Sequence, residues 1–250
     1  MSQSPRPRAL VTGAGVRLGQ AIATALAEAG FDLVLHYHRS TTGVKHTAMM
    51  AQKHAARTTL VQADLSTVAG CDTLAAAAAP VDAIVHNAAL YEAVPFAELD
   101  AVAWDRMQAV NCRAPALITR ALLPGLATST LRGGGAVIHI ADIGGERPAP
   151  GFAHYSVSKA GVLMLTRALA VELAPQVRVN SVSPGTVLAP TDLSAATLAG
   201  IRRTIPAGRF GAADDIARTV VFLVRDAPYV TGQDIAVCGG RSVAGPMMAG

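Results

Sequence analysis

The stretch that decides the fold is RALVTGAGVRLG, at residues 8–19. A short apolar strand leads into a turn that contains Gly13, Gly15 and Gly19, and a helical pattern starts near Leu18. Glycines let backbone N–H groups approach a phosphate, and the positive end of a helix dipole favours the same anion. A glycine-rich turn can also be a plain tight turn. Its position between a first strand and a first helix is what indicates a dinucleotide site.

Apolar strands alternate with helical patterns along the rest of the chain. The strands are expected at 8–12, 31–36, 58–62, 81–86, 136–140, 177–182 and 234–237, and the helices at 18–29, 43–57, 66–79, 101–126, 152–173 and 212–225. Gly30 is expected to end the first helix and Ser66 to cap the third. This order predicts an α/β fold, a single Rossmann-type doubly wound domain over residues 1–250 with helices on both faces of a parallel sheet.

Composition excludes several classes of protein. Hydrophobic residues make up 51% of the chain and charged residues 15%, which excludes disorder as the main state. The net charge of +4 is spread over scattered basic residues, so a phosphorylated cofactor or an acidic small molecule explains it better than nucleic acid.

The cysteines and the N-terminal sequence indicate the compartment. Cys71, Cys112 and Cys238 lack metal-site or disulfide spacing, which favours a reducing compartment. Without a signal-peptide pattern or an apolar run of spanning length, a cytoplasmic protein is expected.

The residues that follow the second strand indicate which nicotinamide cofactor is used. They read HYHRS at 36–40, where an enzyme that uses NAD usually places Asp or Glu. The guanidinium of Arg39 and the hydroxyl of Ser40 suit a 2′-phosphate, so NADPH is favoured. His36 and His38 could be read as a metal pair, but the strand offers no third ligand, and no metal is predicted.

Tyr155 and Lys159 are the candidate chemical centre. They stand four residues apart on a predicted helix and therefore share a face. A phenol with its ordinary pKa near 10 is a poor proton-transfer group, and a neighbouring ammonium is expected to lower that pKa. Such a pair is usually a solvated helix face. Its position after the fifth strand of a dinucleotide fold makes it a catalytic candidate.

Together these features resemble the short-chain dehydrogenase/reductase family. The resemblance runs from residue 8 to about 240 and is carried by Thr12-Gly13-x-x-x-Arg17-x-Gly19, Asn87-Ala88-Ala89, Asn111, Tyr155-x-x-x-Lys159 and Pro184-Gly185. It implies a seven-stranded doubly wound sheet, a nicotinamide cofactor and usually a homotetramer paired through the fourth and fifth helices. The cofactor contacts expected are Gly13, Arg17, Leu18, His36, Tyr37, His38, Arg39, Ser40, Asp64, Leu65, Asn87, Ala88, Ala89, Tyr155, Lys159, Pro184, Gly185 and Thr186. As a lone residue, Asp64 could equally be a turn residue ahead of the next helix.

Two departures from the family pattern point to one branch. The family usually has serine 13 residues before the tyrosine and a small residue in the glycine-rich loop; this chain has Asp142 and Arg17. With the HYHRS segment, these changes resemble the pteridine reductase branch, which implies reduction of a dihydropterin or dihydrofolate by NADPH. The resemblance gives Asp142, Tyr155, Lys159 and Asn111 as catalytic residues, and Arg17, Tyr91, Asp142 and Tyr155 as substrate contacts.

The chemistry of Asp142 supports this interpretation. A carboxylate accepts from the amide and amino edge of a pterin, but it would repel a developing alkoxide and cannot donate unless protonated. Tyr91 could stack on the pterin or simply line the pocket, and Asn111 could organise a water or satisfy a backbone carbonyl. Which group donates the proton stays open, and the variable lid at 187–206, with Asp192, gives no specificity. The alternatives are a carbonyl or 3-oxoacyl reductase and a non-catalytic NADP-binding sensor or scaffold.

Overall fold

The computed structural model describes residues 6–188 and 194–244. The strands in these ranges form one sheet, in the order β3-β2-β1-β4-β5-β6-β7, and every neighbouring pair is parallel. Their bounds are β1 Arg8–Val11, β2 Asp32–Tyr37, β3 Thr58–Gln62, β4 Ala83–His86, β5 Gly135–Ile140, β6 Val177–Pro184 and β7 Asp234–Val237. The predicted doubly wound parallel sheet is confirmed.

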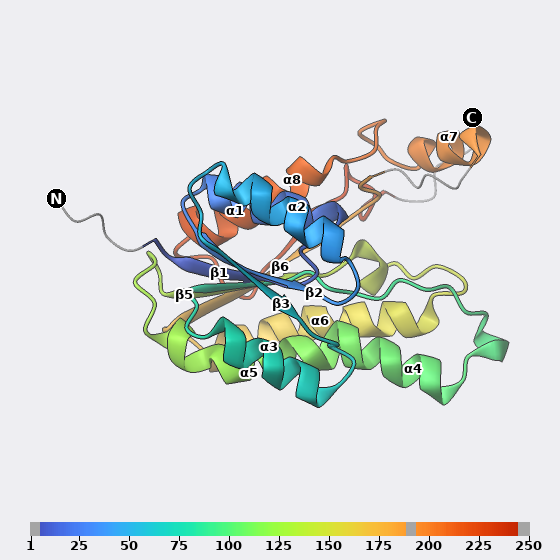
Figure 1. Cartoon of the computed structure of the whole chain (residues 1–250). Helices are drawn as coiled ribbons and strands as arrows, with labels where there is room; N and C mark the ends of the chain where they lie inside the picture. The colour runs from blue at the N-terminus through green and yellow to red at the C-terminus, as the bar shows by residue number, and fades with distance from the viewer. Residues whose placement is uncertain (1–5, 189–193, 245–250) are drawn as a thin grey trace.

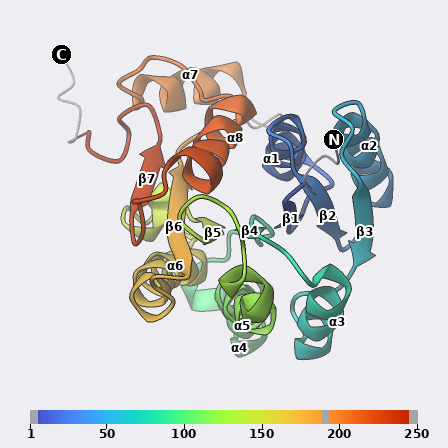
Figure 2. The ribbon, with the colours of Figure 1, turned by 90° about the vertical axis from the view of Figure 1, so that its left-hand side faces the viewer.

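Helices cover both faces of the sheet (Figures 1 and 2). One layer holds α1 Arg17–Glu28, α2 Thr41–Gln52 and α8 Ala213–Val221; the other holds α3 Val68–Ala78, α4 Ala101–Gln108, α5 Ala114–Ala127 and α6 Ala153–Glu172. A further helix, α7 Ala195–Arg203, stands beyond the edge of the first layer. None of the helices in the described ranges has the length and apolar character needed to cross a bilayer.

The core explains why the strands read as continuous apolar runs. Along β1, Ala9 and Val11 pack with α1 and α8 on one face, whereas Leu10 packs with α3 and α5 on the other. All three side chains are fully buried. Because both faces of each central strand are covered, alternation with polar residues would leave polar side chains in a dry interior.

The sheet also fixes where a ligand can bind. The strand order reverses between β1 and β4, and the chain leaves β1 for α1 on one face and β4 for α4 on the other. The loops that follow these two strands therefore diverge and leave a crevice between them. The predicted dinucleotide site lies at this position.

Several predicted element bounds were wrong. The helix expected at 43–57 is α2 and ends at Gln52, since Ala55 adopts a left-handed backbone with φ of 58°. The cap of α3 is Thr67 and not Ser66; the Thr67 hydroxyl accepts from the N–H of Gly70 at 3.0 Å. The helix expected at 101–126 is interrupted by η2 Ala109–Arg113, a π-turn. The variable stretch contains α7, and Asp192 lies outside the described residues.

Candidate active site

Hydrogen bonds join the glycine-rich turn to the end of β4. The Thr12 hydroxyl accepts from the backbone N–H groups of Asn87 and Ala88, at 2.9 and 3.0 Å. The Asn87 side-chain amide donates in return to the carbonyls of Thr12 and Gly13. A Cβ at Gly19 would lie 2.1 Å from the Gly13 carbonyl oxygen, so only glycine allows α1 to begin this close to the turn. Both walls of the crevice are thereby fixed.

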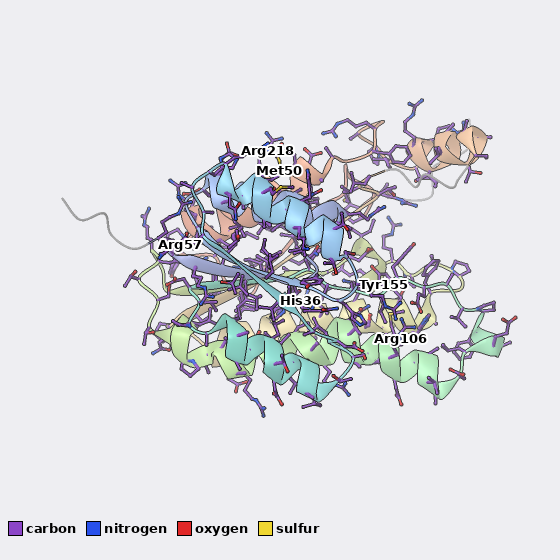
Figure 3. All side chains as sticks on the ribbon, viewed as in Figure 1. His36, Met50, Arg57, Arg106, Tyr155 and Arg218 are labelled. Atoms are coloured by element: carbon purple, nitrogen blue, oxygen red, sulfur yellow. The ribbon has the colours of Figure 1, made fainter. Side chains whose placement is uncertain are left out.

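His36 supports this turn from inside the sheet, at the end of β2 (Figure 3). Its Nδ1 accepts from the N–H of Gly13 at 3.1 Å, which places the ring proton on Nε2, 3.1 Å from the Ala63 carbonyl. Burial lowers the pKa of His36 to about 4, so the ring is neutral at physiological pH. Both ring nitrogens are occupied, and His36 therefore holds the turn rather than offering a polar group to a cofactor.

The next residues carry the candidate phosphate contacts. His38 and Arg39 are exposed, and Ser40 is half-buried. Within the described residues, Arg39 forms no ion pair with a carboxylate. Asp64 lies near this group: its Oδ1 accepts from the N–H of Ser66 at 2.9 Å, which holds the pKa of Asp64 below its usual value. The donors suit a 2′-phosphate. The Asp64 contact forms a turn, which agrees with its turn-residue alternative, and its contact with an adenine amino group stays a prediction.

Asp142 and Tyr155 form the polar centre of the site. The Tyr155 hydroxyl donates to Oδ2 of Asp142 at 2.8 Å, and the N–H of Gly144 donates to Oδ1 at 2.6 Å. Asp142 thereby caps the short 3-10 helix η3, Ile143–Gly145. Burial, and secondly the Asp142 charge, raise the pKa of Tyr155 well above its ordinary value. The expectation that Lys159 lowers this pKa was wrong, because burial and the neighbouring carboxylate both penalise the phenolate.

Lys159 is buried beneath Tyr155. Its Nζ donates to the Ile140 carbonyl at 2.8 Å and lies 5.8 Å from the centroid of the Tyr155 ring. Burial lowers the pKa of Lys159 to about 8, while the Asp142 charge acts in the opposite direction. A Cβ at Gly145 would lie 2.9 Å from the Lys159 carbonyl carbon, so glycine lets the Asp142 loop pack against α6.

Asn111 fastens the loop after β4 to α6. In the π-turn η2, its Oδ1 accepts from the N–H of Leu90 at 2.8 Å. Its Nδ2 donates to the Leu90 carbonyl and to the Ser158 hydroxyl, both at 3.0 Å. The side chain thus has a positioning role, which agrees with the backbone-satisfying alternative. Its catalytic role remains a prediction.

An aromatic cluster covers the polar centre. Tyr91, whose residue surface is 66% exposed, stacks on Phe152 with ring centroids 4.7 Å apart and meets Tyr155 at a right angle with centroids 4.8 Å apart. Phe152 was not among the predicted site residues, although an aromatic residue next to the Tyr155 helix is a usable signal. Arg17 is exposed at the start of α1, in a left-handed backbone with φ of 50°.

The end of β6 closes the site on its far side. A Cβ at Gly185 would lie 2.7 Å from the Cβ of Cys238, so glycine is required for β6 to pass the segment after β7. Beside it, the Thr186 hydroxyl accepts a hydrogen bond from the guanidinium of Arg241. Sequence reasoning missed Arg241, since nothing in its local pattern connects it to Thr186, 55 positions away.

The fold and this site define an oxidoreductase of the Rossmann type that uses a nicotinamide cofactor. A family model described as enoyl-(acyl carrier protein) reductase matches residues 13–242. The chain belongs to the short-chain dehydrogenase/reductase family. Most of the predicted cofactor and catalytic positions lie at or just after the carboxyl ends of β1 to β6, with Tyr155 and Lys159 near the start of α6 and Asn111 in η2.

Similar proteins are spread over several activities. A Streptomyces violaceoruber protein of the granaticin polyketide synthase, named as a ketoacyl reductase, is 36% identical, with 94% of this chain and 95% of the relative covered. Pteridine reductase 1 of Leishmania tarentolae is 32% identical, with 97% and 99% covered. A blue fluorescent protein from a metagenomic library, solved with NADPH, has a TM-score of 0.86 at 30% identity, with 95% and 98% covered. A solved structure named as a betaketoacyl-ACP reductase has a TM-score of 0.85 at 32% identity, with 95% and 98% covered. With it, these names agree better with the carbonyl or 3-oxoacyl reductase alternative than with pterin reduction in particular.

Proposed function

We propose that the chain reduces a 7,8-dihydropterin or dihydrofolate to the tetrahydro form with NADPH, by hydride transfer to a ring C=N bond. The observation that carries this proposal is the Asp142 carboxylate beside the Tyr155 hydroxyl. The Gly144 N–H donates to one carboxylate oxygen and the Tyr155 hydroxyl to the other, and each oxygen keeps a further lone pair that can accept a hydrogen bond. A pterin offers amide and amino N–H groups along one edge, which is the partner that such an acceptor requires.

The side chains have distinct roles in this scheme. When bound, NADPH supplies the hydride. Burial and Asp142 raise the pKa of Tyr155, so its hydroxyl stays protonated but is a weak acid. It would pass that proton to the ring nitrogen, directly or through water, where a neighbouring positive charge stabilises the phenolate. Lys159 supplies positive charge below the phenol, Tyr91 offers an exposed aromatic face, and Arg17 stands at the crevice.

The choice of NADPH rests on the residues after β2. The segment 36–40 contains no Asp or Glu, which an NAD enzyme would usually place there, and instead supplies the donors of His38, Arg39 and Ser40. The structurally similar protein solved with NADPH supports a nicotinamide cofactor.

Reduction of a carbonyl or 3-oxoacyl substrate is the second candidate, because relatives named for such activities support it. Tyr155 and Lys159 would then act on a ketone. Asp142 opposes this function, since an ionised carboxylate destabilises the alkoxide that forms on the substrate oxygen.

A substrate panel tests the proposal. NADPH absorbance is followed with dihydrobiopterin, dihydrofolate and a set of ketones that includes a β-ketoester. We expect turnover of the pterins and slow reduction of the ketones. Rapid β-ketoester reduction without pterin turnover would favour the second candidate. Tight NADPH binding without turnover of any compound would indicate a non-catalytic sensor or scaffold.

We also propose that the protein is a homotetramer. The outer face of α6 carries Val157, Met164 and Val171, spaced seven residues apart and 49%, 58% and 83% exposed. Side chains at this spacing lie on one face of a helix. An exposed apolar stripe of this kind suits a subunit contact.

A further inference from the structure

The segment after β7 brings a positive charge to the substrate side of the site. Arg241 donates through Nη1 to the Thr186 hydroxyl at the end of β6. Its charge also acts on Tyr91, where it lowers the pKa of the phenol against the larger effects of burial and Asp142. The guanidinium therefore lies against the end of β6, within electrostatic range of Tyr91.

A second arginine holds this segment in place. Nη1 of Arg147 donates to the backbone carbonyls of Arg241, Ser242 and Ala244, at 2.7, 3.1 and 2.6 Å. Arg147 stands two residues after the end of η3, the turn that Asp142 caps. The loop that positions the catalytic carboxylate is thus bonded to the segment that positions Arg241. The two groups are held in a fixed relation before any substrate arrives.

Arg241 has unused binding capacity. It is half-buried, and in the ranges 6–188 and 194–244 no carboxylate pairs with it. A guanidinium presents five donors in a planar fork, of which the Thr186 contact uses one. Partly desolvated guanidinium groups of this kind bind carboxylates well, because two parallel N–H bonds can form at once.

We propose that Arg241 is a specificity-determining residue that binds a carboxylate on the tail of the substrate, with Arg147 as its positioning residue. This inference rests on the proposed function. Asp142 and Tyr91 would engage the flat ring, and the carboxylate tail would extend from the ring toward the end of β6. The chain then prefers a pterin with an anionic tail, such as a glutamyl group, over a pterin with a neutral tail.

Equilibrium binding to the protein saturated with NADP⁺ tests this preference without requiring turnover. The two probes are folate, with an anionic tail, and biopterin, with a neutral one. We expect Arg241→Leu to weaken folate binding roughly tenfold or more and to leave biopterin within about twofold, as for the loss of one charge-assisted contact. Arg241→Lys should recover part of the folate affinity. Equal weakening of both probes, or no weakening of either, would overturn the proposal.

Two further variants separate binding from general damage. Arg147→Leu should reduce folate affinity selectively, and Arg147→Lys should restore part of it, because the lysine can still donate to the segment's carbonyls. The control is Arg218→Leu on α8, where the arginine pairs at the surface with Asp214; it should change neither affinity. A folate loss in the control as large as in Arg241→Leu would count against a specific contact.

If pterin reduction is not the function of the chain, the carboxylate contact of Arg241 can still be tested with other substrates. If the wild type binds neither pterin, pterin reduction is wrong, and the same charge comparison is made with acetoacetate and its neutral ethyl ester as substrates. An Arg241-dependent preference for acetoacetate would uphold the carboxylate contact on a different substrate. Identical behaviour of acid and ester in the wild type and Arg241→Leu would overturn it.

Discussion

At the scale of single residues, the proposed function depends on the Asp142–Tyr155 hydrogen bond. The phenol is buried and protonated, and its hydroxyl donates a hydrogen bond to a carboxylate oxygen, so the pair presents a proton and an acceptor side by side. A serine at position 142 would instead offer a neutral hydroxyl that can donate to a substrate carbonyl. One side chain thereby separates recognition of a nitrogen-rich ring from recognition of a ketone.

The variant Asp142→Ser is therefore expected to change specificity. Its kcat/KM for dihydropterin should fall by on the order of tenfold or more, and its kcat/KM for a ketone should rise. The measurement is NADPH oxidation with both substrates, and the unfolding temperature serves as a check on folding. A parallel loss on both substrates would show that Asp142 does not select between them.

The pH dependence of the reaction should report Lys159. Burial disfavours the ammonium and lowers its pKa from 10.5 to about 8, so the charged form is lost as pH rises through about 8. If catalysis needs this charge, kcat/KM declines about tenfold per pH unit above that value. Lys159→Arg, which stays charged, should be slower and should lose this limb. A wild-type profile that stays flat up to pH 10 would contradict the role of the ammonium.

These residues were predictable to different degrees. Tyr155 and Lys159 were found because their spacing places them on one helix face, and Asp142 because it replaces an expected serine. The direction of the Tyr155 pKa shift could not be predicted from the sequence, since it depends on burial and on a carboxylate that approaches from the η3 loop. Arg241 could not be predicted either, because its contact with Thr186 joins residues that are 55 positions apart in the sequence.

At the scale of elements, the strands were easier to predict than the interruptions of the helices. The strands are short apolar runs bounded by turn residues, which sequence shows directly. The π-turn at Ala109–Arg113 carries no glycine or proline, so the pattern continues from α4 into α5 without a visible break. That turn nevertheless places Asn111 against Leu90 and Ser158. A second π-turn, η4 Phe222–Asp226, ends the helix that starts with α8.

A buried arginine stabilises this second π-turn. Arg178 is 4% exposed and donates to the carbonyls of Leu223, Val224 and Ala227, and also to Gly133. Arg178→Met would leave these acceptors unsatisfied and should reduce the free energy of unfolding by about 3 kcal/mol or more. Urea denaturation measures this change.

The control for this prediction lies on the same turn. Arg225 is exposed, and within the part of the chain that the structure describes it pairs only with its neighbour Asp226. Arg225→Met should therefore change the free energy of unfolding by less than about 1 kcal/mol. Equal effects of the two variants would mean that the carbonyl contacts of Arg178 do not stabilise the turn.

At the scale of the whole molecule, the order of the strands was predictable only in outline. Alternating strands and helices require a parallel sheet, but the position of β1 between β2 and β4 follows from packing on both faces. That position creates the crevice at which Thr12 and Asn87, 75 positions apart in the sequence, form hydrogen bonds.

Assembly is the property tested at this scale. Sedimentation should show the wild type at about four times the chain mass of 25.6 kDa. Met164→Lys, in the middle of the α6 stripe, should yield smaller species because it buries a charge in the contact. A stable wild-type species of 25.6 kDa would refute the tetramer and leave the chemistry of the site unaffected.

The most direct test of the central claim is a crystal structure of the protein with NADP⁺ and a bound pterin. We expect a carboxylate oxygen of Asp142 within about 3.2 Å of a ring N–H group, with the ring between Tyr91 and the nicotinamide. A pterin bound elsewhere, or an Asp142 carboxylate turned away from the ring, would contradict the account.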